Sequence, residues 1–279
     1  MPAVSGAPRP PRVLRRAGGV FLARHAALMG APIDFARLDL TRHPPELVTR
    51  ARATWHQRFT TELRSIQIMN RFVAEVVAAG DPLEVYAGAV ELVADEVRHM
   101  ALCAELVTAL GGALTLPEPP EIVEPPAFRD APAPERALAT ALSMLAVNET
   151  LSVAYITDLR DRCPDPVVYA VLAATVADEA EHEGFGWAYI ERALARFPSA
   201  SLPVWRDIVA SALAPSRAFA EPVLARLPPE RRTLEAWPDA ELVPLGLFSA
   251  ERQALLYDRC ARDTLAPRLR ALGLWPDAG

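Results

Sequence analysis

The sequence predicts an all-α protein, a four-helix bundle with additional C-terminal helices. Apolar residues recur at helical spacing through four long segments. Runs of alternating apolar and polar residues, or of β-branched and aromatic residues, which mark β-strands, are scarce. A proline-rich connector divides the four segments into two pairs, as the long crossover of a four-helix bundle does.

The first helix is predicted over residues 44–79 and the second over 82–110. The apolar stripe of the first consists of Leu47, Leu63, Ile66, Met69, Phe72 and Val76. Gly80 then ends the first helix and Pro82 begins the second, since glycine commonly follows a helix and proline occupies a first turn. The pair Gly111 and Gly112 ends the second helix.

The third helix is predicted over residues 134–159 and the fourth over 167–196, with the sequence RDRCPDP between them. Residues 114–135 contain too many prolines for a helix and are predicted to form an extended crossover. The alternative is a linker between two independent helical hairpins. We favour the crossover, because a separate hairpin would leave an apolar face exposed.

The predicted organisation has three parts. Residues 1–43 form an N-terminal extension that is mobile in part, mainly over residues 1–18. Residues 44–197 form the bundle, and residues 198–279 form a C-terminal helical extension packed on it, with a last helix over 249–272. This extension could cap the bundle, take part in a dimer contact or wall a pocket, and the sequence does not select among these roles.

Composition narrows the class of protein. Hydrophobic residues make up 51% and charged residues 23%, as in ordinary soluble globular proteins. No run of about 18 uninterrupted apolar residues predicts a membrane span, and Arg24 and His25 interrupt the apolar run near the start, which argues against a secretory signal. The net charge of −6 argues against nucleic acid or an anionic membrane as a partner. The cysteines, Cys103, Cys163 and Cys260, lack Cys-x-x-Cys spacing, so a reducing, cytoplasmic location is expected.

A short motif occurs twice, as VADEVRH in the second predicted helix and as VADEAEH in the fourth. Residues three apart on a helix lie on nearly the same face, so Glu96 projects with His99 and Glu179 with His182. A carboxylate and an imidazole one turn apart can bind the same metal ion. For either motif alone a solvated charged face would be the simpler interpretation, but both copies lie within apolar stripes.

The other two helices each supply one acidic residue from an apolar run, Glu62 in the first and Glu149 in the third. A buried lone carboxylate is unfavourable unless it is paired or binds a metal. At about 1.5 Å per residue, Glu62 and Glu96 lie roughly 27 and 21 Å from the turn that joins their helices. Glu149 and Glu179 lie roughly 22 and 20 Å from theirs. The four carboxylates are therefore expected near the middle of the bundle.

This order of residues, Glu, Glu-x-x-His, Glu, Glu-x-x-His on four successive helices, resembles the ferritin-like diiron-carboxylate superfamily over residues 44–196. The resemblance implies a ferritin-like bundle that binds two iron ions, or else manganese or a mixed manganese and iron pair. Oxygen ligands with only two imidazoles also suit iron or manganese better than zinc or copper(I). Glu96 and Glu179 would bridge the metals, and each histidine would bind one. The implied ligands are Glu62, Glu96, His99, Glu149, Glu179 and His182.

The residue before each motif glutamate adds to the resemblance. DEVRH and DEAEH are similar to the Asp-Glu-x-x-His motifs of bacterial multicomponent monooxygenases and of ribonucleotide reductase small subunits. The resemblance implies that Asp95 accepts a hydrogen bond from His182 and Asp178 from His99, which would orient each ring. The alternative is that both are exposed helix acids.

Three more residues are candidates for a pocket beside the metals. Gly186 lies one turn after the fourth-helix histidine, where a missing side chain could leave room, although close helix packing explains it equally well. Cys103, one turn after the second-helix histidine, and Tyr155 in the third helix could approach the metals, with a packing role as the simpler alternative. The p-aminobenzoate N-oxygenases resemble this layout but carry a further histidine where this chain has Thr175, which argues against that particular activity.

The expected function is that of a diiron oxidoreductase, which activates O₂ to hydroxylate, N-oxygenate or desaturate a small organic substrate. The long C-terminal extension favours it, because storage ferritins are little more than the bundle, and the doubled Asp-Glu-x-x-His is typical of the oxygen-activating branches. Such an enzyme needs an electron donor, a ferredoxin or a reductase, and could be a homodimer. The alternative is a ferritin-like ferroxidase, or an iron-handling or peroxide-scavenging protein, that acts on no organic substrate.

Overall fold

The computed structural model describes residues 12–14, 17–116 and 126–276. These residues are mostly helical, which confirms the all-α prediction. In chain order the elements are β1 (Arg12–Val13), α1 (Gly19–Met29), α2 (Pro45–Ala78), α3 (Leu83–Ala109), β2 (Thr115–Leu116), α4 (Pro126–Arg129), α5 (Ala133–Thr140), a π-helical segment (Ala141–Asn148), α6 (Glu149–Arg162), α7 (Pro166–Leu194), α8 (Leu202–Arg226), α9 (Ala250–Cys260), a second π-helical segment (Ala261–Leu265) and α10 (Ala266–Ala271).

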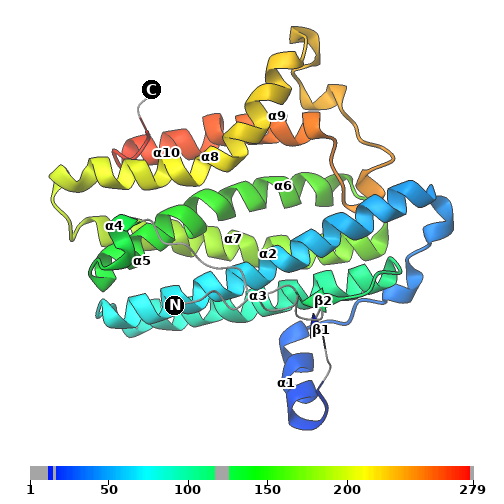
Figure 1. The fold of residues 1–279 in the computed structure, drawn as a ribbon, viewed down its shortest axis with the longest axis horizontal. Helices are drawn as coiled ribbons and strands as arrows, with labels where there is room; N and C mark the ends of the chain where they lie inside the picture. The colour runs from blue at the N-terminus through cyan, green and yellow to red at the C-terminus, as the bar shows by residue number, and fades with distance from the viewer. Residues whose placement is uncertain (1–11, 15–16, 117–125, 277–279) are drawn as a thin grey trace, which may run out of the picture.

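The long helices form two antiparallel pairs (Figure 1). The helix α2 packs along α3, and α6 packs along α7. The elements α5, Ala141–Asn148 and α6 follow one another without a break and form the third long helix. Contacts of α7 with α3, and of α5 with α2, bring the two pairs face to face.

Local sequence determines where these helices begin and end. Gly80 and Gly111 follow α2 and α3 with φ angles of 71° and 75°, in the left-handed region that glycine adopts without a steric penalty. At the start of α7, the side chain of Asp165 accepts hydrogen bonds from the backbone amides of Val167 and Val168. These signals explain why the predicted boundaries of the first, second and fourth helices lie close to the observed ones.

The third long helix contains a feature that the sequence pattern does not predict. Its segment Ala141–Asn148 is π-helical, and Glu149 follows directly. A π-helical turn contains more residues than an α-helical turn, so it rotates the following residues about the helix axis. The continuous stretch Ala133–Arg162 is the one described helix that is long and apolar enough to cross a membrane, and 61% of its most apolar window is buried inside the protein.

The C-terminal extension packs on the third long helix. The helix α8 contacts Ala141–Asn148, and α9 contacts both α8 and α6 (Figure 1). Arg252 of α9 is buried and donates to both carboxylate oxygens of Asp158 on α6, at 2.8 and 2.6 Å. It also donates to the backbone oxygens of Leu234 and Trp237. The helix predicted over 249–272 corresponds to the stretch from α9 to α10.

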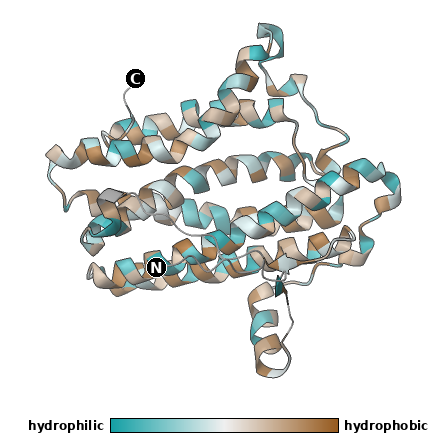
Figure 2. Ribbon diagram, in the orientation of Figure 1, coloured by the Kyte–Doolittle hydropathy of each residue, from teal (hydrophilic) through white to brown (hydrophobic). Residues whose placement is uncertain are grey.

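Four short elements, α1, β1, β2 and α4, differ from the sequence predictions. The helix α1 lies within the expected N-terminal extension, is largely hydrophobic (Figure 2) and has no buried residue. The strands β1 and β2 pair antiparallel although no strand was predicted, since two residues are too few to show alternation. Pro126–Arg129 form a helical turn within the crossover predicted to be extended, because proline is tolerated in a first turn. The mobility expected for residues 1–18 and the extended form expected for 117–125 fall mainly outside the described residues.

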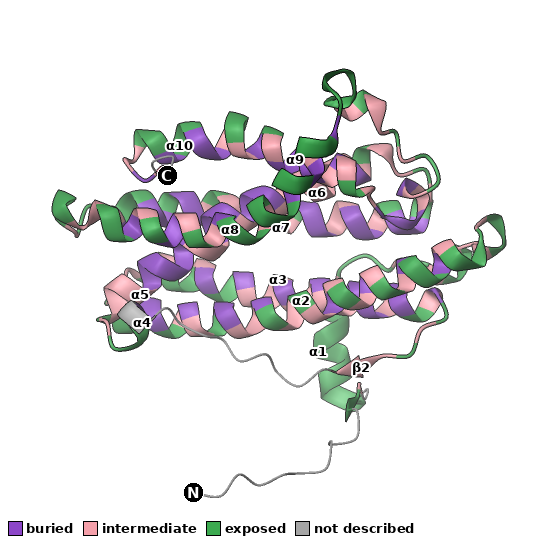
Figure 3. Ribbon diagram, turned by 45° about the horizontal axis from the view of Figure 1, so that its top comes forward, coloured by how far each residue is buried: buried purple, intermediate pink, exposed green. Residues whose placement is uncertain are grey.

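The hydrophobic core consists of two clusters along the long helices. One includes Met69, Phe72 and Leu142, and the other includes Trp55 and Phe59. Figure 3 shows the buried faces of the long helices turned toward one another. On α2, α3 and α7 the glutamates and histidines singled out in the sequence lie between residues of the two clusters, so these polar side chains form a layer across the core.

Candidate metal centre

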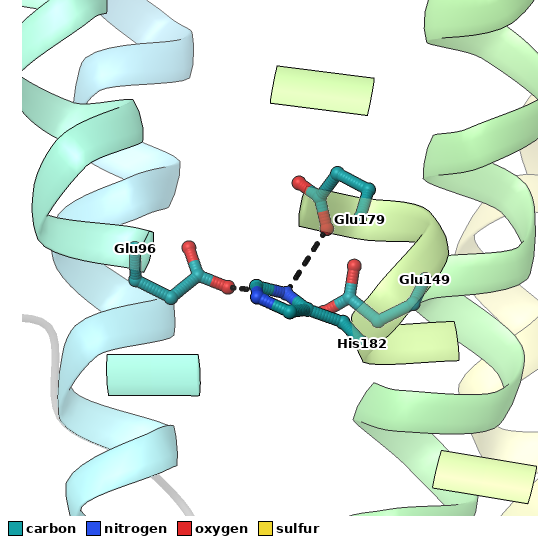
Figure 4. Close-up of side chains that lie close together, drawn as sticks. All are labelled: Glu96, Glu149, Glu179 and His182. Carbon is teal, nitrogen blue, oxygen red and sulfur yellow. Dashed lines mark ion pairs between the residues drawn. The ribbon is translucent and has the colours of Figure 1, made fainter. Parts of the chain in front are cut away.

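Glutamate and histidine side chains from α2, α3, α6 and α7 meet in this polar layer. One group offers ligand atoms that all lie within 4.8 Å of one another, and it consists of Glu96, Glu149, Glu179 and His182. A second group with the same property consists of Glu62, Glu96 and His99. Figure 4 shows the first group, in which carboxylates from both sides point toward the imidazole of His182. These residues could hold a metal ion, and Glu96 belongs to both groups.

Two glutamates lie between the two imidazole rings. The Nδ1 atom of His182 lies 3.7 Å from Oε1 of Glu96 and 3.4 Å from Oε2 of Glu179. The Nδ1 atom of His99 lies 3.9 Å from Oε2 of Glu96 and 3.6 Å from Oε1 of Glu179. Each glutamate therefore directs one oxygen toward each histidine. Each of these carboxylates could therefore contact an ion held beside either ring.

The outer nitrogen of each imidazole faces an aspartate on the opposite helix. The Nε2 atom of His99 lies 2.9 Å from Oδ2 of Asp178, and the Nε2 atom of His182 lies 3.4 Å from Oδ2 of Asp95. In a neutral ring Nε2 then carries the proton, which leaves the lone pair of Nδ1 directed inward. Sequence reasoning missed Arg98, which contacts both aspartates through Nη2. Its position three residues after Asp95, on the same helix face, was the available signal.

The centre is buried and contains polar atoms without partners. Both histidines and three of the four glutamates are buried, while Glu62 is half-buried. Among the described residues, Nδ1 of His99, Nδ1 of His182 and Oε2 of both Glu96 and Glu179 have no hydrogen-bond partner. Buried polar atoms of this kind are unfavourable unless something satisfies them. Metal cations bound in the layer would satisfy all four, so the residue set fits a pair of divalent ions.

The four carboxylates cannot all carry their charge without a cation. Burial raises the pKa of Glu96 and of Glu149 well above the ordinary value, and neighbouring carboxylates add to both shifts. Burial also acts on Glu179, but the imidazole of His182 at 3.4 Å and the carboxyl of Glu149 lower its pKa to about 2. Burial opposes the charged form of His182, yet the hydrogen bond to Asp95 and the nearby carboxylate of Glu179 raise its pKa to about 9. Protons therefore supply the positive charge that bound metal would otherwise provide.

We expect the metal-free protein to lose stability as the pH rises from about 4.5 to about 9. Glu96 and Glu149 keep protons in the folded state at pH values where the unfolded chain, with its ordinary pKa of 4.5, has released them. His182 acts with the same sign between 6.5 and about 9. Metal retention should instead improve with pH, because the ions displace these protons. Urea unfolding across this range, with and without metal, measures both trends, and a metal-free stability that rises with pH would contradict the assignment.

A cavity of about 540 Å³ lies beside the centre, and Glu62 and Glu179 form part of its wall. Cys103, Tyr155 and Thr175 also line it. A second cavity, of about 280 Å³, is lined by Glu62, Glu179 and Tyr155 as well, and it reaches two further glutamates of the centre, Glu96 and Glu149.

Of the two explanations left open for Gly186, the structure supports close helix packing. Gly186 lines neither of these cavities. A Cβ atom at this position would lie 2.4 Å from Cβ and 2.7 Å from the carbonyl carbon and oxygen of Leu145. The glycine therefore allows α7 to approach the backbone of Ala141–Asn148, and it leaves no room near the metals.

The outer wall of the larger cavity belongs to the C-terminal extension, which contributes Phe219, Leu247, Phe248 and Gln253. Side chains of α2 hold the segment of residues 245–248 through its backbone oxygens. Trp55 donates to Leu245 at 2.9 Å, Arg58 to Gly246 at 2.9 Å, and Arg50 to Phe248 at 2.7 Å. Of the roles considered for the extension, the structure shows that it walls a pocket.

Comparisons with known proteins found no relative. No protein-family model matches the sequence, and no curated protein or solved structure matches the chain. The resemblance to the ferritin-like superfamily therefore rests on the motifs and their spacing along the chain.

Proposed function

We propose that this protein is a ferritin-like diiron-carboxylate enzyme that uses O₂ to oxidise a small organic substrate. The observation that carries the proposal is the placement of Glu96 and Glu179, each with one oxygen toward each histidine. Carboxylate oxygens with two imidazoles favour iron or manganese. The residues that would hold two ions are Glu62, Glu96, His99, Glu149, Glu179 and His182. When bound, the ions would supply the electrons and the Lewis acidity for the reduction of O₂.

The chain's own residues would orient the ligands. Asp95 and Asp178 fix the imidazoles so that Nδ1 faces inward, and Arg98 holds both aspartates. Partners of this kind orient a ligand and raise its basicity. The hydrophobic clusters pack on both sides of the layer, and the two cavities leave a route to its glutamates.

The larger cavity supports oxidation of an organic molecule over iron storage. Its volume of about 540 Å³ lies within the range of small-molecule sites. Two of the proposed metal ligands, Glu62 and Glu179, lie in the cavity wall. Phe219 and Phe248 of the same wall come from the C-terminal extension, which a four-helix bundle alone would lack. Burial and the nearby charge of Glu62 raise the pKa of Cys103 well above its ordinary value, so this thiol stays neutral in the cavity wall. Turnover would require an external electron donor such as a ferredoxin or a reductase.

Metal analysis together with O₂ uptake tests the proposal. After anaerobic loading we expect about two iron or manganese ions per chain, and O₂ uptake by the reduced iron form that continues only while an electron donor is present. Size-exclusion chromatography should give a monomer or a dimer. A chain that retains neither metal would refute the proposal. A large shell that oxidises Fe(II) without organic substrate would identify the ferroxidase alternative instead.

A further inference from the structure

We infer that the substrate carries a carboxylate that binds to Arg58, with an apolar body that fills the 540 Å³ cavity toward Glu62 and Glu179. The role of this ligand as the substrate rests on the proposed function. The binding site itself consists of residues outside the proposed metal ligands.

Arg58 lies on α2 one turn before Glu62 and lines the cavity. Its Nη2 atom donates to the backbone oxygen of Gly246 at 2.9 Å, and its guanidinium carbon lies 4.3 Å from the centre of the Trp55 ring. Its Nη1 atom is buried and has no hydrogen-bond partner among the described residues. A guanidinium offers five donors in a planar fork, and the donation to Gly246 is the one hydrogen bond that Arg58 makes among the described residues, while the residue is only half-buried and lines the cavity.

The charges of the cavity wall favour an anionic ligand. The wall contains two arginines, Arg50 and Arg58, and its acidic residues are Glu62 and Glu179. Both glutamates would be neutralised by bound metal, which leaves the arginines uncompensated. Burial lowers the pKa of Arg58, so its positive charge is unfavourable while no ligand occupies the cavity. An anion beside it would relieve this penalty.

The remaining walls indicate what kind of anion the cavity accepts. Its apolar lining includes Trp55, Ile156, Leu159, Leu172, Leu247 and Phe248. A planar carboxylate matches the fork of a single guanidinium, and Arg58 is the half-buried arginine of the wall whereas Arg50 is exposed. Arg58 and Glu62 are four residues apart on one helix, or about 6 Å along its axis. A molecule held at Arg58 by its carboxylate would therefore present its other end to the proposed metal ligands.

Calorimetric titration of the full-length protein with benzoate and with benzamide tests the inference, because the two probes share a shape and differ in charge. We expect benzoate to bind at least tenfold more tightly than benzamide. Arg58→Gln should remove this preference, and Arg58→Lys, which keeps the charge but loses the fork, should retain part of it. Arg64→Gln is the matched control. Arg64 is an exposed arginine on the same helix, and it lines the 280 Å³ cavity and not the larger one.

Equal binding of the two probes, or no benzoate binding, would overturn the inference. A preference that survives in Arg58→Gln, or that is lost in Arg64→Gln, would do the same. If Arg58→Gln does not fold, as judged by circular dichroism, Arg58→Lys takes its place. A preference for benzoate in Arg58→Lys as large as in the parent protein would then overturn the inference.

The titrations are repeated after chelation, with the metal content of each variant measured. Arg58-dependent benzoate binding in a protein that retains no metal would support the site while the proposed function fails. Two ions per chain with no preference for benzoate would support the metal centre while the proposed carboxylate site fails.

Discussion

Glu96→Ala is expected to remove metal from both positions of the centre. Glu96 belongs to both groups of ligand atoms and directs one oxygen toward each histidine. Loss of a residue that only hydrogen-bonds to a metal ligand lowers metal affinity roughly 10- to 100-fold. Loss of Glu96, a proposed ligand itself, should lower it by more. Folding of the metal-free variant should be no weaker than that of the metal-free parent, because the change removes a buried carboxyl whose Oε2 atom has no hydrogen-bond partner among the described residues. Metal analysis and urea unfolding measure the two effects.

Two further variants make this result specific. Glu91→Ala alters an exposed acid on the same helix and should leave the metal content unchanged. Glu149→Ala alters a residue that belongs to one group only, so we expect it to retain more metal than Glu96→Ala. Parental metal content in Glu96→Ala would show that the ligand assignment is wrong.

Gly186→Ala is expected to destabilise the folded protein by about 3 kcal/mol, as overpacking of a filled core does. The added Cβ would lie 2.4 Å from Cβ and 2.7 Å from the carbonyl group of Leu145. Backbone atoms cannot turn away as the end of a side chain can, so α7 and the third long helix would have to separate. Urea unfolding of the full-length chain gives the change in the free energy of unfolding.

Gly184→Ala is the matched control, two residues earlier on the same helix. Gly184 is exposed, and a Cβ there would meet nothing within 4 Å. Alanine should stabilise this position by up to about 1 kcal/mol, because it favours the helix more than glycine does. Equal effects of the two substitutions would mean that the close approach at Gly186 does not limit stability.

The sequence predicts the long helices well because its signals there are local. The first predicted helix, 44–79, differs from Pro45–Ala78 by one residue at each end, since a proline and Gly80 define those ends. The π-helical segment Ala141–Asn148 packs against α7 and α8, and contacts between segments so far apart leave no local pattern in the sequence. The helix α1 has no buried face, so its sequence does not need the apolar stripe by which the long helices are predicted.

The same distinction applies to the site. The spacing of Glu96 with His99 and of Glu179 with His182 follows from helix geometry, so their convergence could be anticipated from the sequence. Arg58 could not be identified in this way, because its neighbours include Gly246, which lies far along the chain. Gly186 was ambiguous for the same reason, since its partner Leu145 lies on another helix.

The attachment of residues 245–248 to α2 has a consequence for how such a protein could diversify. Its three hydrogen bonds use backbone oxygens, which every amino acid provides, so they place no demand on the side chains at Leu247 and Phe248. Gly246 is the exception, since its φ angle is 69° and a Cβ would lie 2.7 Å from the Trp55 ring. Leu247 is held by its burial in the core, but mutations at the partly buried Phe248 could accumulate over generations and change which molecules are accepted, while the path of the loop and the buried carboxylates are inherited intact.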